Sequence, residues 1–169
     1  MAALFEETGR YIAMRFLVKP LDFPNAFMYG AGHGGVEAML LCGVASISNV
    51  ASAVMINSGT MSAQLATLDA EKAADTLSAL WTTPSLTFFA GGVERIIAVV
   101  LHLSLSILVF QSIRKKSQKD LLNAYLFHFV IDSLSVLLSA VASVWVVELV
   151  VALVTGGAVL MAKYACMEE

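Results

Sequence analysis

Ionisable side chains interrupt the apolar segments of this chain at spacings that place them on one face of a helix. Glu6, Glu7 and Arg10 lie within the stretch LFEETGRYIAMRF, and Arg10 is three or four residues from each carboxylate. His33 and Glu37 form an i,i+4 pair in the stretch YGAGHGGVEAM. Residues at these spacings are neighbours on a helix. Carboxylates beside imidazoles can act as general acids and bases or bind a metal ion, so the pattern indicates hydrolytic or metal chemistry.

Two later apolar segments supply the remaining histidines. His102 follows Glu94 and Arg95 by two turns, and His128 and Asp132 form another i,i+4 pair. A carboxylate at that spacing can orient an imidazole or share a metal with it, and we expect both side chains of this pair to face the protein interior. Each motif taken alone also fits a structural role, because ion pairs and hydrogen-bonded histidines occur inside helical bundles.

The composition is that of a membrane protein. Of the 169 residues, 59% are hydrophobic and 14% are charged, and the mean hydropathy is +0.81. In soluble domains about a quarter of the residues are charged. The net charge is -3 and no basic patch is visible, so we expect the lipid bilayer, and no nucleic acid, as a partner. Cys42 and Cys166 are too few for a disulfide framework and form no CxxC motif.

The lengths of the apolar runs predict an all-α, polytopic transmembrane helical bundle, because a helix of about 20 apolar residues crosses a bilayer. Residues 62–81 mix leucines with charges and end at Trp81, a pattern typical of an amphipathic helix at the membrane surface. No repeat or second domain is visible, so residues 1–169 are expected to form one transmembrane domain. About five spanning helices are expected, at residues 4–18, 27–56, 84–113, 121–141 and 145–164.

The distribution of basic residues predicts the orientation. With five spans, Lys19, loop 114–119 and Lys163 fall on one side, and the acidic segment 57–84 falls on the other. Basic loops favour the cytoplasmic side, so we expect a multi-pass protein of the plasma membrane with loop 114–119 in the cytoplasm. This orientation puts Met1 on the outer side, and we therefore expect further helices upstream of this chain.

The ionisable residues of four helices are expected to share one depth. Counted from the basic ends at 1.5 Å per residue, they lie roughly 9 to 18 Å deep, and only Glu94 is clearly deeper. A charge at the bilayer centre costs about 2.5 to 3.5 kcal/mol on insertion scales, so these groups should line a shared cavity. The cavity could activate water, or it could be the ion or proton site of a membrane transporter or binding protein. Convergence on one water-sized site favours the first reading, and a continuous channel favours the second.

Four motifs, FEETGR, GHGGVE, ERIIAVVLH and HFVID, occur in this order on successive predicted helices. Together they resemble the YhfC family of bacterial membrane proteins, which is related to the PrsW-type and CAAX prenyl-protease-like (CPBP) intramembrane proteases. The first motif is similar to EExxK/R, the third supplies His102, and the fourth is similar to HxxxD/N. The second aligns in two ways: Glu37 matches the Glu of FxxxE with His33 in place of Phe, or Tyr29 and His33 match an aromatic-xxx-His element.

The resemblance implies an intramembrane endopeptidase that hydrolyses a peptide bond in or near the membrane. Its substrate would be a membrane-embedded peptide or protein. Family members usually carry additional N-terminal helices, which agrees with the upstream helices expected above.

The resemblance also implies roles for the polar residues. Glu6 or Glu7 would be the general base on water, and Arg10 would keep the two carboxylates ionised and oriented. Asp132 would orient His128. A Zn²⁺-dependent mechanism and a metal-free, glutamate-type mechanism both stay open. Residues that would polarise the water are His33 or Glu37, with His102 and His128; as ligands of a metal the resemblance suggests Glu37, His102 and His128.

Overall fold

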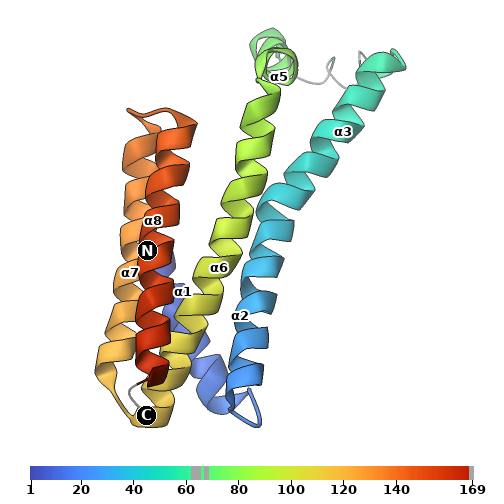
Figure 1. The fold of residues 1–169 in the computed structure, drawn as a ribbon. Helices are drawn as coiled ribbons and strands as arrows, with labels where there is room; N and C mark the ends of the chain where they lie inside the picture. Colours follow the sequence, from blue (N-terminus) through green and yellow to red (C-terminus); the bar gives the residue numbers. More distant parts are fainter. Residues whose placement is uncertain (62–65, 67–68, 168–169) are drawn as a thin grey trace.

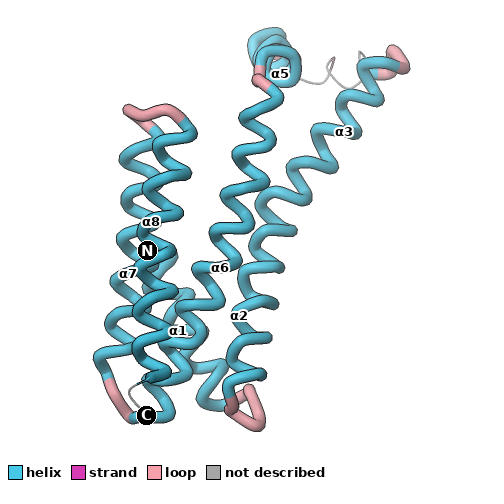
Figure 2. Tube along the Cα trace, in the orientation of Figure 1, coloured by secondary structure: helices cyan, strands magenta, loops and turns pink. Residues whose placement is uncertain are grey.

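The computed structural model of the chain describes residues 1–61, 66 and 69–167, and these residues form helices and no strand. Short turns connect most of the helices (Figures 1 and 2). Residues 62–65 and 67–68, from the first part of the expected amphipathic helix, lie outside the described residues. In chain order the helices are α1 (Ala2–Phe16), α2 (Phe23–Ala38), η1 (Met39–Gly43), α3 (Val44–Asn57), α5 (Ala70–Thr82), α6 (Ser85–Lys115), α7 (Gln118–Ser139) and α8 (Val144–Met167).

Four helical segments are long and apolar enough to cross a membrane, namely Phe23–Asn57, Ser85–Lys115, Gln118–Ser139 and Val144–Met167. They correspond to the last four expected spans, so the prediction of an all-α, polytopic membrane protein is confirmed. The first expected span, α1, has 15 residues and is not one of these four. It packs against α6 and α7 and lies beside the lower half of α6 in Figure 1.

Side-chain caps fix where two helices begin. Asp22 accepts a hydrogen bond from the backbone N–H of Asn25 at 2.9 Å, and Pro24 occupies the first turn, where its missing N–H has no cost. Helix α2 therefore begins at Phe23 rather than at residue 27. Ser117 likewise accepts the backbone N–H of Lys119 at 3.3 Å, so α7 begins at 118 rather than at 121.

Helix α6 is the centre of the bundle. It packs against α2 on one side and against α7 and α8 on the other, as Figure 1 shows. Leu105, Leu108 and Val109 of α6 are completely buried. Large apolar side chains such as Leu122 and Phe129 of α7 are instead exposed on the outside. This distribution suits a bundle whose outer face meets lipid rather than water.

Two glycines let α2 approach α6 closely. A Cβ atom on Gly30 would lie 2.9 Å from the backbone of His102 and Leu103, and one on Gly34 would lie 3.1 Å from His102 Cβ. Close backbone approach at small residues is a common way for membrane helices to pack. By contrast, a Cβ on Gly35 would meet nothing within 4 Å.

Beyond this contact the long second helix leaves the bundle. The π-helical segment η1 follows α2 directly, and α3 then leans away from α6 (Figure 1). No residue of α3 is buried. Together the three segments have 35 residues, or about 52 Å at 1.5 Å per residue, which exceeds the roughly 30 Å hydrocarbon core of a bilayer. A helix of this length must tilt, bend or extend beyond the hydrocarbon core.

The side chain of Arg10 ties α1 to α6. Its Nη1 donates to the backbone oxygen of His102 at 2.9 Å and to Ser106 Oγ at 3.1 Å, and its Nη2 donates to His102 Nδ1 at 2.7 Å. The same guanidinium forms an ion pair with Glu7 at 3.3 Å. Arg10 and Glu7 are both completely buried, so these bonds compensate charges that water cannot reach, although among the described residues Glu7 Oε2 and Arg10 Nε have no hydrogen-bond partner.

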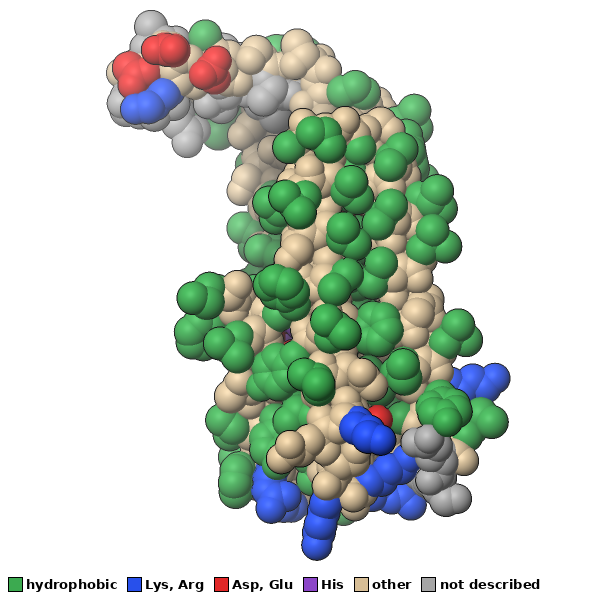
Figure 3. All heavy atoms as spheres, turned by 90° about the vertical axis from the view of Figure 1, so that its left-hand side faces the viewer, with side chains coloured by type: hydrophobic (Ala, Val, Ile, Leu, Met, Phe, Trp, Pro, Cys, Tyr) green, Lys and Arg blue, Asp and Glu red, His purple; other side chains and the backbone are tan. Residues whose placement is uncertain are grey.

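Charged side chains are segregated along the long axis of the molecule (Figure 3). Three carboxylates, Asp69, Glu71 and Asp75, occupy the end that holds α5. Asp69 accepts the backbone N–H of Lys72 and pairs with its ammonium group, and both contacts lower the pKa of Asp69. The opposite end carries most of the basic residues, namely Arg15, Lys19, Arg114, Lys115, Lys116, Lys119 and Lys163. Which end is cytoplasmic stays a prediction.

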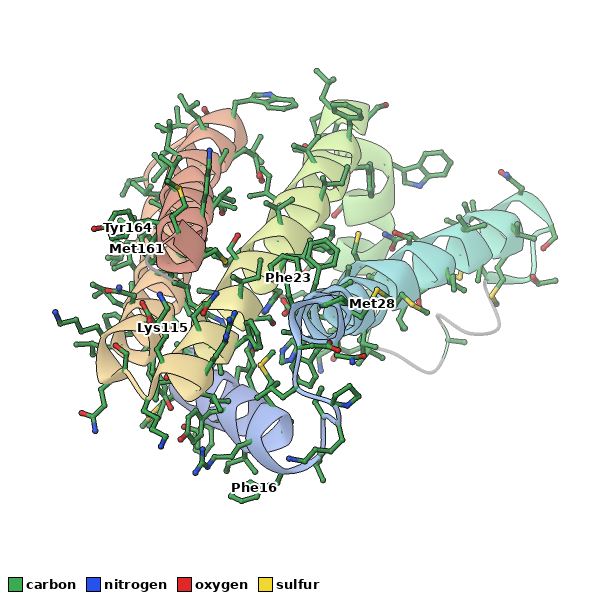
Figure 4. All side chains as sticks on the ribbon, turned by 60° about the horizontal axis from the view of Figure 1, so that its bottom comes forward. Phe16, Phe23, Met28, Lys115, Met161 and Tyr164 are labelled. Atoms are coloured by element: carbon green, nitrogen blue, oxygen red, sulfur yellow. The ribbon has the colours of Figure 1, made fainter. Side chains whose placement is uncertain are left out.

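A view from the basic end shows how side chains leave the bundle there (Figure 4). Phe16 and Tyr164 point away from the helices and are largely exposed. The Nζ atom of Lys115 instead donates to the backbone oxygen of Ala165 and so links the ends of α6 and α8.

We predict that Arg10→Ala lowers the free energy of unfolding by about 3 to 5 kcal/mol, because it leaves the buried Glu7 without its cation. Thermal unfolding in detergent, followed by circular dichroism, measures the change. Arg15→Ala is the matched control, since Arg15 lies exposed on the same helix and its loss should cost less than about 0.5 kcal/mol. Equal losses in the two variants would contradict the role given to Arg10.

We also predict opposite effects for two glycine substitutions in α2. Gly30→Ala should destabilise the fold by about 1 to 3 kcal/mol, because its Cβ meets backbone that cannot move aside freely. Gly35→Ala has open space and should be neutral or stabilise by up to about 1 kcal/mol, as alanine favours the helix. The same unfolding measurement compares them, and a harmless Gly30→Ala would show that the helices do not pack as described.

Candidate active site

The structure brings all eight sequence-predicted polar residues together where α1, α2, α6 and α7 meet. Helix α1 supplies three of them and α2 supplies two, while α6 and α7 supply the rest. Each forms at least one hydrogen bond or ion contact with another member of the group. The residues are Glu6, Glu7, Arg10, His33, Glu37, His102, His128 and Asp132.

His128 is oriented by the buried carboxylate of Glu7. The distance from His128 Nδ1 to Glu7 Oε1 is 2.8 Å, and the carboxylate can only accept, so Nδ1 carries a proton. The other ring nitrogen, Nε2, faces Glu6 Oε2 and Asp132 Oδ1, each at 3.7 Å. Both side chains of this pair were expected to face inward: that of His128 is buried, whereas that of Asp132 contacts His128 but is 40% exposed.

His102 is fixed by a donor on one side and an acceptor on the other. Arginine has no acceptor atom, so His102 Nδ1 must accept the bond from Arg10 Nη2. The ring proton therefore sits on Nε2, which lies 2.6 Å from Glu37 Oε2. Glu37 is also 3.5 Å from Arg95 Nη1. One imidazole tautomer thus follows from the heavy-atom positions alone.

Glu6 and His33 form the more open part of the site. Glu6 Oε2 lies 3.2 Å from His33 Nε2, and the two side chains are 31% and 23% exposed, whereas Glu7 is fully buried. The His33 ring stacks on His102 with centroids 4.8 Å apart, and His102 meets His128 edge-on at 5.6 Å. The three histidine rings of the chain are therefore contiguous.

Two cavities reach this cluster. The first, of about 530 Å³, is lined by Glu6, His33 and Glu37 together with Tyr29, Gly32, Val36 and Leu40. The second, of about 380 Å³, touches Glu37, His102, His128 and Asp132 from the side of Arg95. The polar groups can therefore be approached both along the face of α2 and between α6 and α7.

Part of the cluster has the donor atoms of a metal site. Among the described residues, one ligand atom from each of Glu6, His33, Glu37 and His102 lies within 4.8 Å of the others. The set predicted from the family resemblance was Glu37, His102 and His128. The two sets share Glu37 and His102, and the identity of the ligands stays a prediction.

Three polar partners of the site were not assigned a role from the sequence. Ser106 binds Arg10, Arg95 pairs with both Glu37 and Glu94, and Tyr125 hydrogen-bonds to Thr8. The signal for Ser106 is its i,i+4 spacing from His102, and for Arg95 its place inside an apolar run. Tyr125 lies one turn before His128 but carries no charge that would mark it.

Comparison with known proteins agrees with the motifs. The sequence pattern of the YhfC intramembrane metalloprotease family matches residues 1–151. The "Uncharacterized membrane protein YhfC" of Bacillus subtilis (strain 168) is 37% identical over 158 residues, which is 91% of this chain and 61% of that protein. The chain thus spans about three fifths of the length of this relative. No solved structure matches. The four motifs and the matched residues show that the chain belongs to the YhfC intramembrane metalloprotease family.

Proposed function

We propose that the protein is an intramembrane endopeptidase in which Glu6 is the general base on the attacking water. The different surroundings of the two adjacent carboxylates carry this proposal. Glu7 is fully buried and is engaged by Arg10 and His128. Glu6 is partly exposed and lies on the wall of the 530 Å³ cavity. Only the second of these can meet both water and substrate.

The positions of the neighbouring imidazoles support this role. Glu6 Oε2 and His128 Nε2 are 3.7 Å apart, which is too long for a direct hydrogen bond and suits two groups that bind one water molecule. Glu6 would take a proton from that water as its oxygen attacks the substrate carbonyl carbon. The proton would then pass to the leaving nitrogen as the peptide bond breaks. Glu7 holds His128 in place for this step, as a carboxylate commonly orients a catalytic imidazole.

The donor atoms could also hold a metal ion, as the family name implies, and we propose that this metal is zinc. Imidazole and carboxylate are zinc ligands, and three protein ligands leave one position for water. We assign His33, Glu37 and His102 as these ligands and keep Glu6 beside them as the base. For His102 to bind zinc through Nε2 as a neutral imidazole, its ring proton would have to move to Nδ1, and Arg10 Nη2 would have to give up its bond to that atom. When bound, zinc would lower the pKa of water and polarise the carbonyl.

His102 should be the weakest of these ligands. A zinc-bound histidine normally donates its other N–H to an acceptor, whereas Nδ1 of His102 meets a guanidinium donor. His33 and Glu37 should therefore contribute most of the affinity for the metal.

The first cavity suggests the class of substrate. Tyr29, Val36 and Leu40 make its wall largely apolar, and Val36 and Leu40 are also exposed on the outer face of the long helix. A peptide segment arriving from the lipid would meet apolar side chains first and carboxylates last. The proposed substrate is thus a membrane-embedded peptide or protein, and the proposed place is the plasma membrane, with loop 114–119 in the cytoplasm.

The two carboxylates should respond differently to substitution. Glu6→Gln should keep the fold and reduce cleavage of a membrane-embedded reporter at least about 100-fold, which is the lower range for loss of a general base. Glu7→Gln should lower both the unfolding temperature and the rate, because His128 and Arg10 lose a charged partner. Initial cleavage rates and thermal unfolding of the full-length protein measure both effects. A Glu6→Gln variant that cleaves at the wild-type rate would remove the basis for the mechanism.

Zinc content should separate ligands from the base. The full-length protein, purified without chelators, should hold about one zinc ion per chain. His33→Gln and Glu37→Gln should lose it, whereas Glu6→Gln should retain it while being inactive. Glu148→Gln is the matched control, because Glu148 is a buried carboxylate on α8 outside the donor group. The zinc assignment fails if an active, zinc-free enzyme is obtained, or if all four variants bind zinc alike.

A further inference from the structure

A third cavity, of about 590 Å³, lies at the basic end of the molecule between α1, α6 and α7. None of its lining residues lines either of the two cavities at the catalytic cluster. Three basic residues line it, namely Arg15, Lys116 and Lys119, together with two tyrosines, Tyr11 and Tyr125. The region lies where Figure 3 shows basic side chains gathered below an apolar surface.

The three cations are not used by the fold. Among the described residues, the side chains of Arg15, Lys116 and Lys119 form no ion pair or hydrogen bond. Their neighbours differ, because Arg114 has a partner and Lys115 donates to the oxygen of Ala165. The three residues are exposed, and an anion bound among them would be attracted by three positive charges at short range.

The backbone of Lys116 adds a second reason to look for a ligand. Lys116 ends α6 in the left-handed conformation, with φ 54 and ψ 34. Glycine is the usual residue at this helix-capping position, because a side chain is strained there. A lysine here is costly for the fold, and this lysine lines the cavity.

Apolar side chains complete the cavity. Ile113, Leu121 and Leu122 share its wall with the cations, and Leu122 is 66% exposed on the outer face of α7. A free phosphate would need only the cations, whereas a phospholipid offers a phosphate for the cations and acyl chains for the leucines. We propose that this cavity binds the phosphate of an anionic phospholipid whose acyl chains lie along α7.

The bound lipid would brace the helices that carry the catalytic cluster. Tyr125 of the cavity is hydrogen-bonded to Thr8 at 2.7 Å. The Thr8 hydroxyl already donates to Leu4, so Tyr125 is the donor in this bond. Thr8 adjoins Glu7, and Tyr125 lies one turn before His128. Occupancy of the cavity should therefore stabilise the packing of α1 against α7.

The test is a comparison of lipid binding by the full-length protein in detergent. Phosphatidylglycerol should bind, as measured by native mass spectrometry, and should raise the unfolding temperature more than phosphatidylcholine does. Lys116→Gly combined with Lys119→Gln should weaken phosphatidylglycerol binding roughly 30-fold, since each lysine near an anionic lipid is worth about 1 kcal/mol. Because glycine relieves the strain at position 116, this variant should fold at least as well as the wild type without lipid.

Lys19→Gln with Lys163→Gln is the matched control, because it removes the same charge from the same end outside the cavity. It should leave phosphatidylglycerol binding within about twofold. Equal losses in the two double variants would attribute the effect to overall charge and overturn the proposal. Inorganic phosphate that competes fully with the lipid at millimolar concentration would identify a free-anion site and also overturn it. Absence of any preference for phosphatidylglycerol would have the same consequence.

Discussion

The buried guanidinium of Arg10 is the constraint on which the arrangement of the site depends. A charge without water must be surrounded by acceptors, and Arg10 finds them on its own helix and on α6. Because the N–H donors of a guanidinium point in fixed directions, the acceptors that meet Nη1 and Nη2 must take fixed places too. This holds α1 in register with α6, fixes the His102 tautomer, and leaves Glu7 facing His128. The neighbouring carboxylate of Glu6 is left out of this network and faces the cavity.

Close packing of α2 against α6 brings His33 and Glu37 to the cluster that Arg10 organises between α1 and α6. His33 can stack on His102 only if the two helices nearly touch, and the missing side chains of Gly30 and Gly34 allow that approach. After Glu37 the helix changes to a π-helical turn and then departs from α6. Such turns are frequent at functional sites because they alter the direction of a helix locally. Here the turn follows the last polar residue of α2, so the tightly packed part of the helix ends where the site ends.

The sequence was a good guide to the fold because bilayer thickness sets the length of a spanning helix. Long apolar runs located α6, α7 and α8 within a few residues. The errors at the starts of α2 and α7 came from local caps at Asp22 and Ser117, whose effect on a helix start is a matter of single hydrogen bonds. Depth counting also placed the histidines in one layer, since rise per residue is fixed in a helix.

Roles within the cluster could not be predicted in the same way. Glu6 and Glu7 are adjacent in sequence, and only the rotation of α1 against its neighbours separates a buried carboxylate from one at a cavity. The spacing of His33 and Glu37 likewise fits two motif alignments equally well. In the structure both residues line the same cavity and contact different partners, His33 with Glu6 and Glu37 with His102. Because both residues belong to one site, the position of the site does not depend on which of the two motif alignments is chosen.

The difference between the buried Glu7 and the accessible Glu6 also bears on the choice between a hydrolase and a transporter. An ion pathway needs exchangeable groups at successive depths, whereas these side chains contact one another around a single cluster. Glu7 and Arg10 are fixed by bonds that cannot open without exposing a buried charge, so they are poorly suited to passing an ion along. Glu6, His33 and Glu37 remain partly accessible and line a largely apolar cavity. Asp132 is also accessible, from the second cavity. Activation of one water molecule requires an accessible base, here Glu6, held in place by fixed buried groups, here Glu7 and Arg10. This division of roles, rather than the number of polar residues, favours hydrolysis over ion transport.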